Sequence, residues 1–193
     1  MENLKEDANP KIICICGSPR KGNSWWMLQK ASDSVERNGG FIEIIHLKDQ
    51  KIDWCEGCLT CEDTGICIIK DDMKSVIEKM LSSQGIIIST PVYFNSIPAK
   101  LKCFFDRLNP LLKDERLSGK KLSVFIVGQL SGKDGEKSRK DVMEYFLTLA
   151  DIFNMDLIGI VDAEGRGAKD LEGNDELADK CERLGKKLVT NLR

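Results

Sequence analysis

The sequence has little histidine, no excess of charge of either sign and no long apolar run. His46 is the only histidine in 193 residues, so the chain cannot build a histidine-rich metal site. Lysine and arginine number 29 against 31 aspartate and glutamate, and a net charge of -2 gives no electrostatic footprint for a nucleic-acid or membrane-surface partner. No segment approaches the ~20 apolar residues of a membrane span.

The eight cysteines are too few for a disulfide scaffold in a chain of this length. Residues 1–10 carry acidic and polar side chains without an apolar core, so we expect no secretory signal there and a cytoplasmic protein. In a reducing compartment, clustered cysteines more often bind metal or perform redox chemistry than form disulfides. The length is that of one domain, and we expect residues 1–193 to form a single one.

Five short apolar runs alternate with segments of helical period. The runs are typical of strands buried on both faces of a parallel sheet, and they lie at 11–16, 41–47, 85–89, 122–127 and 157–161. Helical patterns lie between and after them, at 26–35, 73–81, 97–108, 142–153 and 177–188. The alternation predicts an α/β, doubly wound parallel sheet, and five strands favour the flavodoxin-like order 2-1-3-4-5 with a ligand at the carboxyl ends of the strands. One insertion, residues 48–70, follows the second strand.

The loop after the first predicted strand, residues 17–24 (GSPRKGNS), is suited to binding a phosphate. It offers backbone N–H groups and a helix N-terminus to an anion. The spacing almost matches a Walker A loop, but Asn23 stands where that motif has lysine, which argues against a nucleoside triphosphatase. The dinucleotide motif G-x-G-x-x-G is absent as well. The alternative is an ordinary strand-to-helix turn in which Ser24 caps the helix.

This loop, together with residues 90–102 (TPVYFNSIPAKLK) and 105–107 (FDR), resembles the NAD(P)H-dependent FMN reductase branch of the flavodoxin-like superfamily. The resemblance implies an FMN cofactor whose phosphate is held by Ser18, Arg20, Asn23 and Ser24. It also implies that the isoalloxazine ring is bordered by Pro91, Val92, Tyr93, Phe94 and Asn95. The alternative for Tyr93 and Phe94 is plain packing beneath the next helix. Gly128 lies at the end of the fourth predicted strand, in a glycine-rich stretch that can approach a ligand.

The cysteine motif in the insertion has the form C-x2-C-x2-C-x5-C and consists of Cys55, Cys58, Cys61 and Cys67. Three cysteines at this spacing on a turn-rich loop can converge on one polynuclear iron centre, which a fourth cysteine closes. Zinc sites more commonly use two separated C-x-x-C pairs. Zinc, uncoordinated thiols and a redox-active disulfide remain alternatives. The other cysteines are expected to be buried packing residues without a further role, and they are Cys14, Cys16, Cys103 and Cys181.

The motif, followed by G-x-C-x3-D-D-M at 65–73, resembles the iron-sulfur flavoproteins of anaerobic archaea and bacteria. That resemblance implies a 4Fe-4S cluster bound by the four cysteines and a homodimer or homotetramer in which the cluster of one subunit lies near the flavin of its neighbour. Our first hypothesis is electron transfer from a ferredoxin-like donor through the cluster and FMN to a small acceptor, with no catalytic side chain. The second is an NAD(P)H-dependent FMN or quinone reductase without a cluster, and the third is a flavin-free zinc module.

Trp54, the pair Asp71 and Asp72, and His46 are interpreted from their positions in the sequence. Trp54 precedes the first cysteine, where it either shields a metal centre from water or anchors the loop on the body of the protein. Asp71 and Asp72 are expected to begin the next helix, because carboxylates are favourable at a helix N-terminus. His46 lies near the end of the second predicted strand and is expected to be structural.

Overall fold

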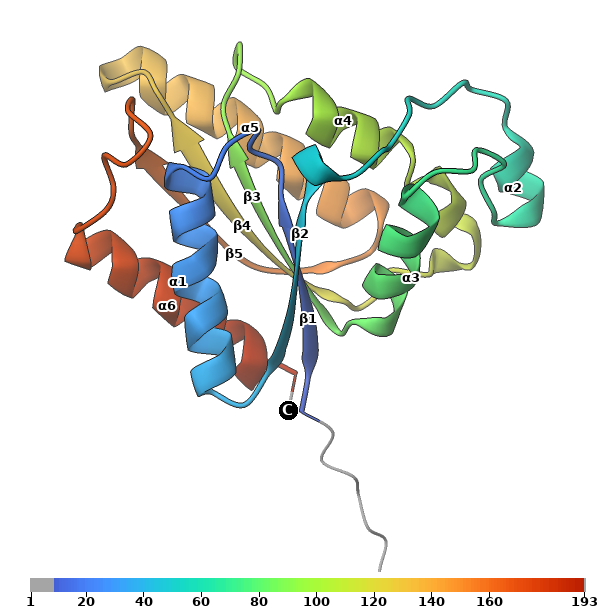
Figure 1. Ribbon diagram of the computed structural model, residues 1–193, viewed down its shortest axis with the longest axis horizontal. Coiled ribbons are helices and arrows are strands. Elements are labelled where there is room, and N and C mark those ends of the chain that lie inside the picture. The colour runs from blue at the N-terminus through green and yellow to red at the C-terminus, as the bar shows by residue number, and fades with distance from the viewer. Residues whose placement is uncertain (1–8, 193) are drawn as a thin grey trace, which may run out of the picture.

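The computed structural model describes residues 9–192 and contains a five-stranded sheet with helices on both faces (Figure 1). Its strands are β1 (Lys11–Cys16), β2 (Phe41–His46), β3 (Gly85–Pro91), β4 (Lys121–Gly128) and β5 (Asp156–Glu164). The order is β2-β1-β3-β4-β5, and every neighbouring pair is parallel. The predicted flavodoxin-like topology is therefore confirmed. Residues 1–8 belong to the N-terminal segment for which the sequence predicts no secretory signal, and they lie outside the described residues.

Helices form a layer on each face of the sheet. One layer consists of α1 (Asn23–Arg37) and α6 (Asp175–Thr190), which lie side by side in Figure 1. The other consists of α3 (Met73–Ser82), α4 (Ala99–Asp106) and α5 (Gly132–Ile152). None of the described helices is long and apolar enough to cross a membrane.

The inner strand β1, which lies between β2 and β3, contributes to both hydrophobic cores because successive side chains of a strand point to opposite faces. Ile13 and Ile15 pack in the core beneath α3, α4 and α5. Ile12, Cys14 and Cys16 pack in the core beneath α1 and α6. Burial on both faces explains why this strand is a continuous apolar run in the sequence rather than an alternating pattern.

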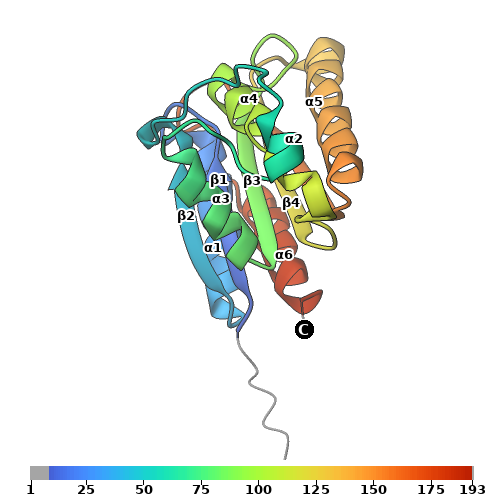
Figure 2. The same ribbon diagram turned by 90° about the vertical axis from the view of Figure 1, so that its right-hand side faces the viewer.

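The insertion between β2 and α3 forms a loop with a single short helix. A 3-10 turn, η1 (Leu47–Asp49), follows β2, and α2 (Thr60–Thr64) stands in the middle of the segment that we call the cysteine loop, residues 50–72. Figure 1 shows this loop reaching outward from the sheet, and in Figure 2 the same side faces the reader. Two 3-10 turns after α4, η2 (Asn109–Leu111) and η3 (Lys113–Glu115), lie next to it, with η2 in contact with α2.

Four helices begin at other residues than the hydrophobic pattern predicts. α5 begins at Gly132 rather than at 142, and α6 begins at Asp175 rather than at 177. The apolar pattern places a helix at 97–108, whereas α4 begins at Ala99. Pro98 is the reason, because the residue before a proline is disfavoured in the helical region, so Ile97 stays outside. The pattern also places a helix at 26–35, whereas α1 begins at Asn23, directly after Gly22. The predicted phosphate loop is therefore shorter, and its last two residues form the first turn of α1.

Candidate cofactor site

The loop between β1 and α1 lies at the carboxyl ends of the strands and is held in one shape by its own hydrogen bonds. The Gly17 N–H donates to the carbonyl of Ser89 in β3 at 2.8 Å. The Ser18 hydroxyl donates to the Arg20 carbonyl at 2.8 Å. A side chain at Gly17 would place its Cβ 2.7 Å from Cδ2 of Leu101, so glycine is needed for the close approach of α4. The loop leads directly into the N-terminus of α1, which is favourable for an anion.

His46 anchors this loop from the end of β2. Its Nε2 lies 2.7 Å from the carbonyl oxygen of Ser18. A carbonyl can only accept, so Nε2 carries the proton and donates. The imidazole also packs on Trp25, with 5.2 Å between ring centroids. These contacts agree with the expectation that His46 is structural, since it is buried and joins β2 to the predicted phosphate loop.

Asn23 is joined to the loop that follows β5. Its Nδ2 donates to the Gly167 carbonyl at 2.8 Å, and its Oδ1 accepts from the Leu171 N–H at 3.3 Å. A Cβ at Gly22 would lie only 2.9 Å from the Ala168 carbonyl oxygen, so the two loops are in close contact. Sequence reasoning missed this neighbour of the phosphate loop. The signal for it was the pair of glycines at 165 and 167, which permit such an approach.

The turn after β3 exposes its aromatic side chains. Val92 continues the pairing with β4 through a 2.8 Å hydrogen bond to the Val127 carbonyl, and Tyr93 and Ser96 then exchange two backbone hydrogen bonds at 2.8 and 3.0 Å. Phe94 and Asn95 take φ values of 50° and 56°. Asparagine is common in this conformation, whereas a bulky phenylalanine is strained there.

Phe94 is fully exposed and Tyr93 is 45% exposed. The alternative that both rings pack beneath the next helix is therefore wrong. A strained and exposed aromatic side chain at the strand ends suits contact with a flat ligand.

Gly128 at the end of β4 is explained by packing. A Cβ there would lie 2.8 Å from Cγ of Arg139, whose side chain fills the adjacent space. Arg139 Nε pairs with Asp162 Oδ2 at 2.8 Å, and Nη1 donates to the Leu130 carbonyl at 3.2 Å. An FMN contact by Gly128 stays a prediction, but the glycine is already required by Arg139.

All eight cysteines are free, and they divide by exposure. Cys55 and Cys58 are exposed, whereas Cys61 and Cys67 are half-buried. Across residues 9–192, no three side chains of histidine, cysteine, aspartate or glutamate gather as they would around a metal ion. The structure thus places the four motif cysteines on one loop without bringing their sulfurs together. Trp54 is 75% exposed, so it does not anchor the loop on the body of the protein.

The remaining cysteines are mostly the packing residues that the sequence predicts. Cys14, Cys16 and Cys181 are buried in the core beneath α1 and α6. Burial raises the pKa of the Cys14 thiol to about 12 and that of Cys181 to about 12. Cys103 differs from the prediction, because it is only half-buried and its thiol donates to the Asp53 carbonyl at 3.2 Å. By contrast, hydrogen bonds from the Thr60 N–H and hydroxyl lower the pKa of the Cys58 thiol, which favours the thiolate that metals bind.

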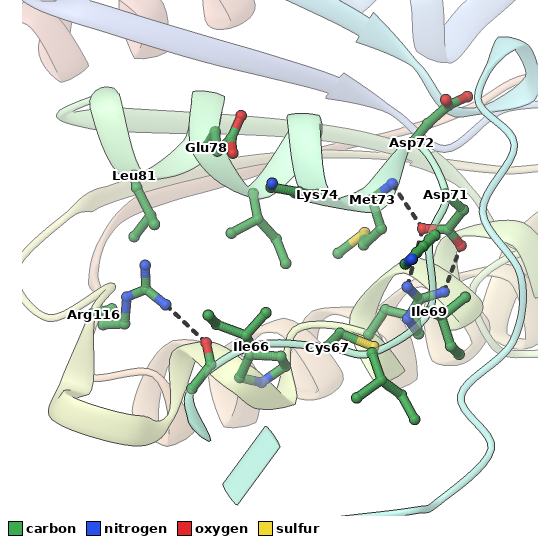
Figure 3. A pocket seen from close by; sticks show the side chains of 16 residues that line it. Ile66, Cys67, Ile69, Asp71, Asp72, Met73, Lys74, Glu78, Leu81 and Arg116 are labelled. Carbon is green, nitrogen blue, oxygen red and sulfur yellow. Dashed lines mark hydrogen bonds and ion pairs between the residues drawn. The ribbon is translucent and has the colours of Figure 1, made fainter. Parts of the chain in front are cut away.

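A buried ion pair closes the base of the cysteine loop. Arg107 follows α4, and its Nη1 and Nη2 lie 2.6 and 3.0 Å from the two carboxylate oxygens of Asp71. Dashed lines in Figure 3 mark the interactions of the labelled Asp71. Arg107 Nη1 also donates to the Asp53 carbonyl at 2.8 Å, and the Asp53 N–H donates to Asp71 at 2.9 Å. The start and the end of the loop are therefore held at one point, on the guanidinium.

The charge state of Asp71 follows from this pair. Burial alone raises the pKa of a carboxyl group, but here the hydrogen bonds from Arg107 and from the Asp53 and Met73 N–H groups outweigh burial, so the pKa of Asp71 is lowered. Asp71 and Asp72 are expected from the sequence to begin the next helix, but α3 begins at Met73 with Asp72 as its N-cap. The Asp71 carboxylate lies just before the helix and accepts from the Met73 N–H at 3.0 Å. Sequence reasoning missed Arg107 as its main partner, although Arg107 belongs to the 105–107 motif.

A cavity of about 960 Å³ lies between the last part of the cysteine loop and α3 (Figure 3). Its walls are mainly apolar and include Ile66, Ile69 and Leu81. Cys67 stands on the wall formed by the loop. At the far side, Arg116 Nη1 donates to the Gly65 carbonyl at 3.1 Å and so fixes the loop where the cavity begins.

Residues 10–184 match the sequence model of the NADPH-dependent FMN reductase family. The chain belongs to this family. An iron-sulfur flavoprotein of Methanocaldococcus jannaschii is 31% identical to it, over 93% of this chain and 95% of the relative. Another from Archaeoglobus fulgidus is 33% identical, over 93% of this chain and 79% of the relative. Among solved structures, a flavone reductase has a TM-score of 0.71 at 19% identity, over 93% of this chain and 62% of that one, which shows a shared fold.

The geometry of this family member fits FMN. The loop of residues 17–22 and the N-terminus of α1 offer backbone N–H groups for a phosphate, and the exposed turn at 92–96 offers aromatic surface for a ring at the same edge of the sheet. Family and fold together make the protein an FMN-dependent oxidoreductase. The cysteine loop carries four free thiols, the ligand type that iron-sulfur centres use, although the structure does not gather their sulfurs. Beside the loop, a buried N–H of Arg107 has no hydrogen-bond partner among the described residues.

Proposed function

We propose that the protein transfers electrons between FMN and a 4Fe-4S cluster held by Cys55, Cys58, Cys61 and Cys67. The observation that carries this proposal is the presence of four free thiols at residues 55–67, on a loop whose two ends are joined by a buried ion pair. When bound, such a cluster supplies one-electron chemistry and FMN links it to acceptors. The iron-sulfur flavoproteins named above support the proposal by similarity.

In this proposal the chain binds and orients FMN through two loops. Ser18, Arg20 and Ser24 stand with the backbone N–H groups around the phosphate, and the Asn23 amide steadies the loop from the side of residues 167–171. His46 keeps the Ser18 carbonyl turned away from the phosphate, since that oxygen accepts the imidazole N–H. The ring is bordered by Pro91, Val92, Tyr93, Phe94 and Asn95. No side chain is required as acid, base or nucleophile.

The proposed partners follow from the surface of the cysteine loop. Its large apolar side chains are more than half exposed at Trp54, Leu59, Ile66 and Ile68. Exposed apolar surface of this kind is typical of interfaces, and we infer a homodimer or homotetramer in which a second subunit covers it. A ferredoxin-like donor and a small-molecule acceptor complete the proposal. Eight free cysteines agree with a reducing cytoplasm.

Anaerobic purification tests the cluster directly. We expect about four iron and four acid-labile sulfide per chain, together with FMN. Replacing Cys58→Ala is expected to reduce the iron and sulfide content to background while FMN remains bound. Cys103→Ala is the matched control, because its thiol donates to the backbone carbonyls of Ile52 and Asp53 and lies outside the cysteine motif, so its loss should leave iron content unchanged. Wild-type protein that carries FMN but neither iron nor sulfide would contradict the proposal.

A second candidate function is an NAD(P)H-dependent FMN or quinone reductase without a cluster. Two observations favour it: the family match to NADPH-dependent FMN reductases, and the four sulfurs that the structure does not gather. Stopped-flow reduction of the flavin by NADPH separates the two functions. Rapid flavin reduction that is equal in the wild type and in Cys58→Ala would favour the second candidate.

A further inference from the structure

The segment after α4 directs polar side chains at the cysteine loop. Four residues of this segment donate hydrogen bonds to the loop through side-chain nitrogens: Arg107, Asn109, Lys113 and Arg116. Lys113 and Arg116 donate to backbone carbonyls, those of Asp63 and Gly65. Carbonyl contacts fix the path of the loop. The other two residues stand beside sulfur atoms.

Asn109 is the first of these two. It begins the 3-10 turn η2, and its Nδ2 lies 3.2 Å from Sγ of Cys61. A thiolate has no proton to donate, so only the amide N–H of Asn109 can form this hydrogen bond when Cys61 is ionised. Amide N–H groups directed at sulfur ligands stabilise the negative charge that these ligands carry.

Arg107 is the second. Its side chain is 1% exposed, and its Nη atoms are engaged by Asp71 and the Asp53 carbonyl. Its Nε–H is buried and lacks a hydrogen-bond partner among the described residues, while the guanidinium interacts electrostatically with the Cys67 sulfur. A buried donor without an acceptor is costly, so its presence in a protein calls for an explanation. An ionised Cys67 would supply the missing acceptor.

We propose that Arg107 and Asn109 are positioning residues that donate hydrogen bonds to the Cys67 and Cys61 sulfurs and thereby raise the reduction potential of the centre these cysteines bind. The inference rests on the proposed function. Its physical basis is that one-electron reduction adds one negative charge to the centre and its ligands. Donors already directed at the sulfurs stabilise that charge, so the reduced form is favoured. The four cysteines are the ligands, and these two residues set their electrostatic environment.

The test is a redox titration of the anaerobically purified holoprotein with dithionite, followed by electron paramagnetic resonance. Asn109→Leu removes the donor at nearly constant size, and we expect the equilibrium for one-electron reduction to fall about fivefold. Asn109→Gln keeps an amide donor and should recover most of the shift. Arg107→Lys removes the Nε–H but keeps the charge beside Asp71, and it should shift the potential in the same direction. Arg116→Lys is its matched control and should leave the potential unchanged.

Iron content and thermal midpoint are measured on the same samples. A merely structural role would change these two quantities without moving the potential of the clusters that remain. This inference alone would be overturned if the wild-type holoprotein contains iron and sulfide but the reduction potential is unshifted in Asn109→Leu and Arg107→Lys. Wild-type protein without iron and sulfide would overturn the proposed function and this inference together.

Discussion

Arg107 and Asp71 form a two-point ion pair in which the two side chains are 1% and 5% exposed. The residues are 36 positions apart in the sequence, and their contact closes the cysteine loop at its base. Taking two charges out of water is costly, so a pair this deep is maintained only with good geometry and additional hydrogen bonds. The Asp53 carbonyl and the Asp53 and Met73 N–H groups supply those bonds.

Breaking this pair is expected to destabilise the whole protein. Asp71→Asn leaves the Arg107 charge buried without its counter-ion, and we expect a loss of about 3–5 kcal/mol in the free energy of unfolding. Urea denaturation measures it. The control is Asp106→Asn, which breaks the exposed pair with Lys102 and should cost no more than about 0.5 kcal/mol. Equal losses in the two variants would contradict the assignment of the buried pair.

The same pair predicts a dependence of stability on pH. The pKa of Asp71 is lower in the folded chain than its unfolded value of about 3.9. A lowered pKa means that the stabilisation is complete above about pH 4 and disappears as pH falls through the folded-state pKa. We therefore expect the stability difference between the wild type and Asp71→Asn to be constant from about pH 5 to 7 and to shrink in more acidic buffer. A difference that grows on acidification would have the wrong sign.

His46 is expected to control FMN affinity without touching the cofactor. His46→Ala removes the hydrogen bond to the Ser18 carbonyl and frees the loop, so we expect FMN to bind roughly tenfold more weakly, about 1.4 kcal/mol. Quenching of flavin fluorescence measures the Kd. Phe41→Ala, at an exposed position on the same strand, serves as the control and should bind as the wild type does. An unchanged Kd in His46→Ala would refute the anchoring role.

Phe94 is expected to destabilise the FMN-free protein and to strengthen FMN binding. Glycine tolerates a φ of 50°, so Phe94→Gly should stabilise the FMN-free protein by about 1 kcal/mol while it weakens FMN binding. Leu59→Gly is a matched control, because Leu59 is also a large, exposed residue at positive φ but lies in the cysteine loop. It should give the gain in thermal stability without the loss of FMN affinity. A loss of affinity in both variants would argue against a ring contact by Phe94.

Alkylation is expected to separate the two groups of cysteines. In metal-stripped, folded protein treated with iodoacetamide at pH 8, the exposed thiols of Cys55 and Cys58 should react first. Cys14 and Cys181 are buried with pKa values of about 12 and should react only after unfolding. Peptide mass spectrometry in native buffer and in guanidinium chloride gives both results. Early labelling of Cys14 would mean that β1 is not a buried inner strand.

The linear sequence determined the fold and the place of both candidate sites. Apolar runs alternating with helical periods are local signals of burial, and they were sufficient for the sheet order β2-β1-β3-β4-β5. Spacing alone singled out Cys55, Cys58, Cys61 and Cys67, because chain proximity brings them onto one loop wherever that loop lies. The predicted helix start at residue 97 was wrong by two residues, because α4 begins at Ala99 after Pro98, which is an equally local reason.

The tertiary structure decided the contacts between distant residues. That Arg107 pairs with Asp71, that His46 holds Ser18, and that Phe94 faces solvent depends on which strand ends and loops meet in space. Composition and periodicity report how strongly a segment is buried, but not which partner satisfies a given polar group. The eight cysteines illustrate the difference. Their spacing in the sequence separated the four on the loop from the rest. Only the tertiary structure showed which of their sulfurs lie beside hydrogen-bond donors of other residues.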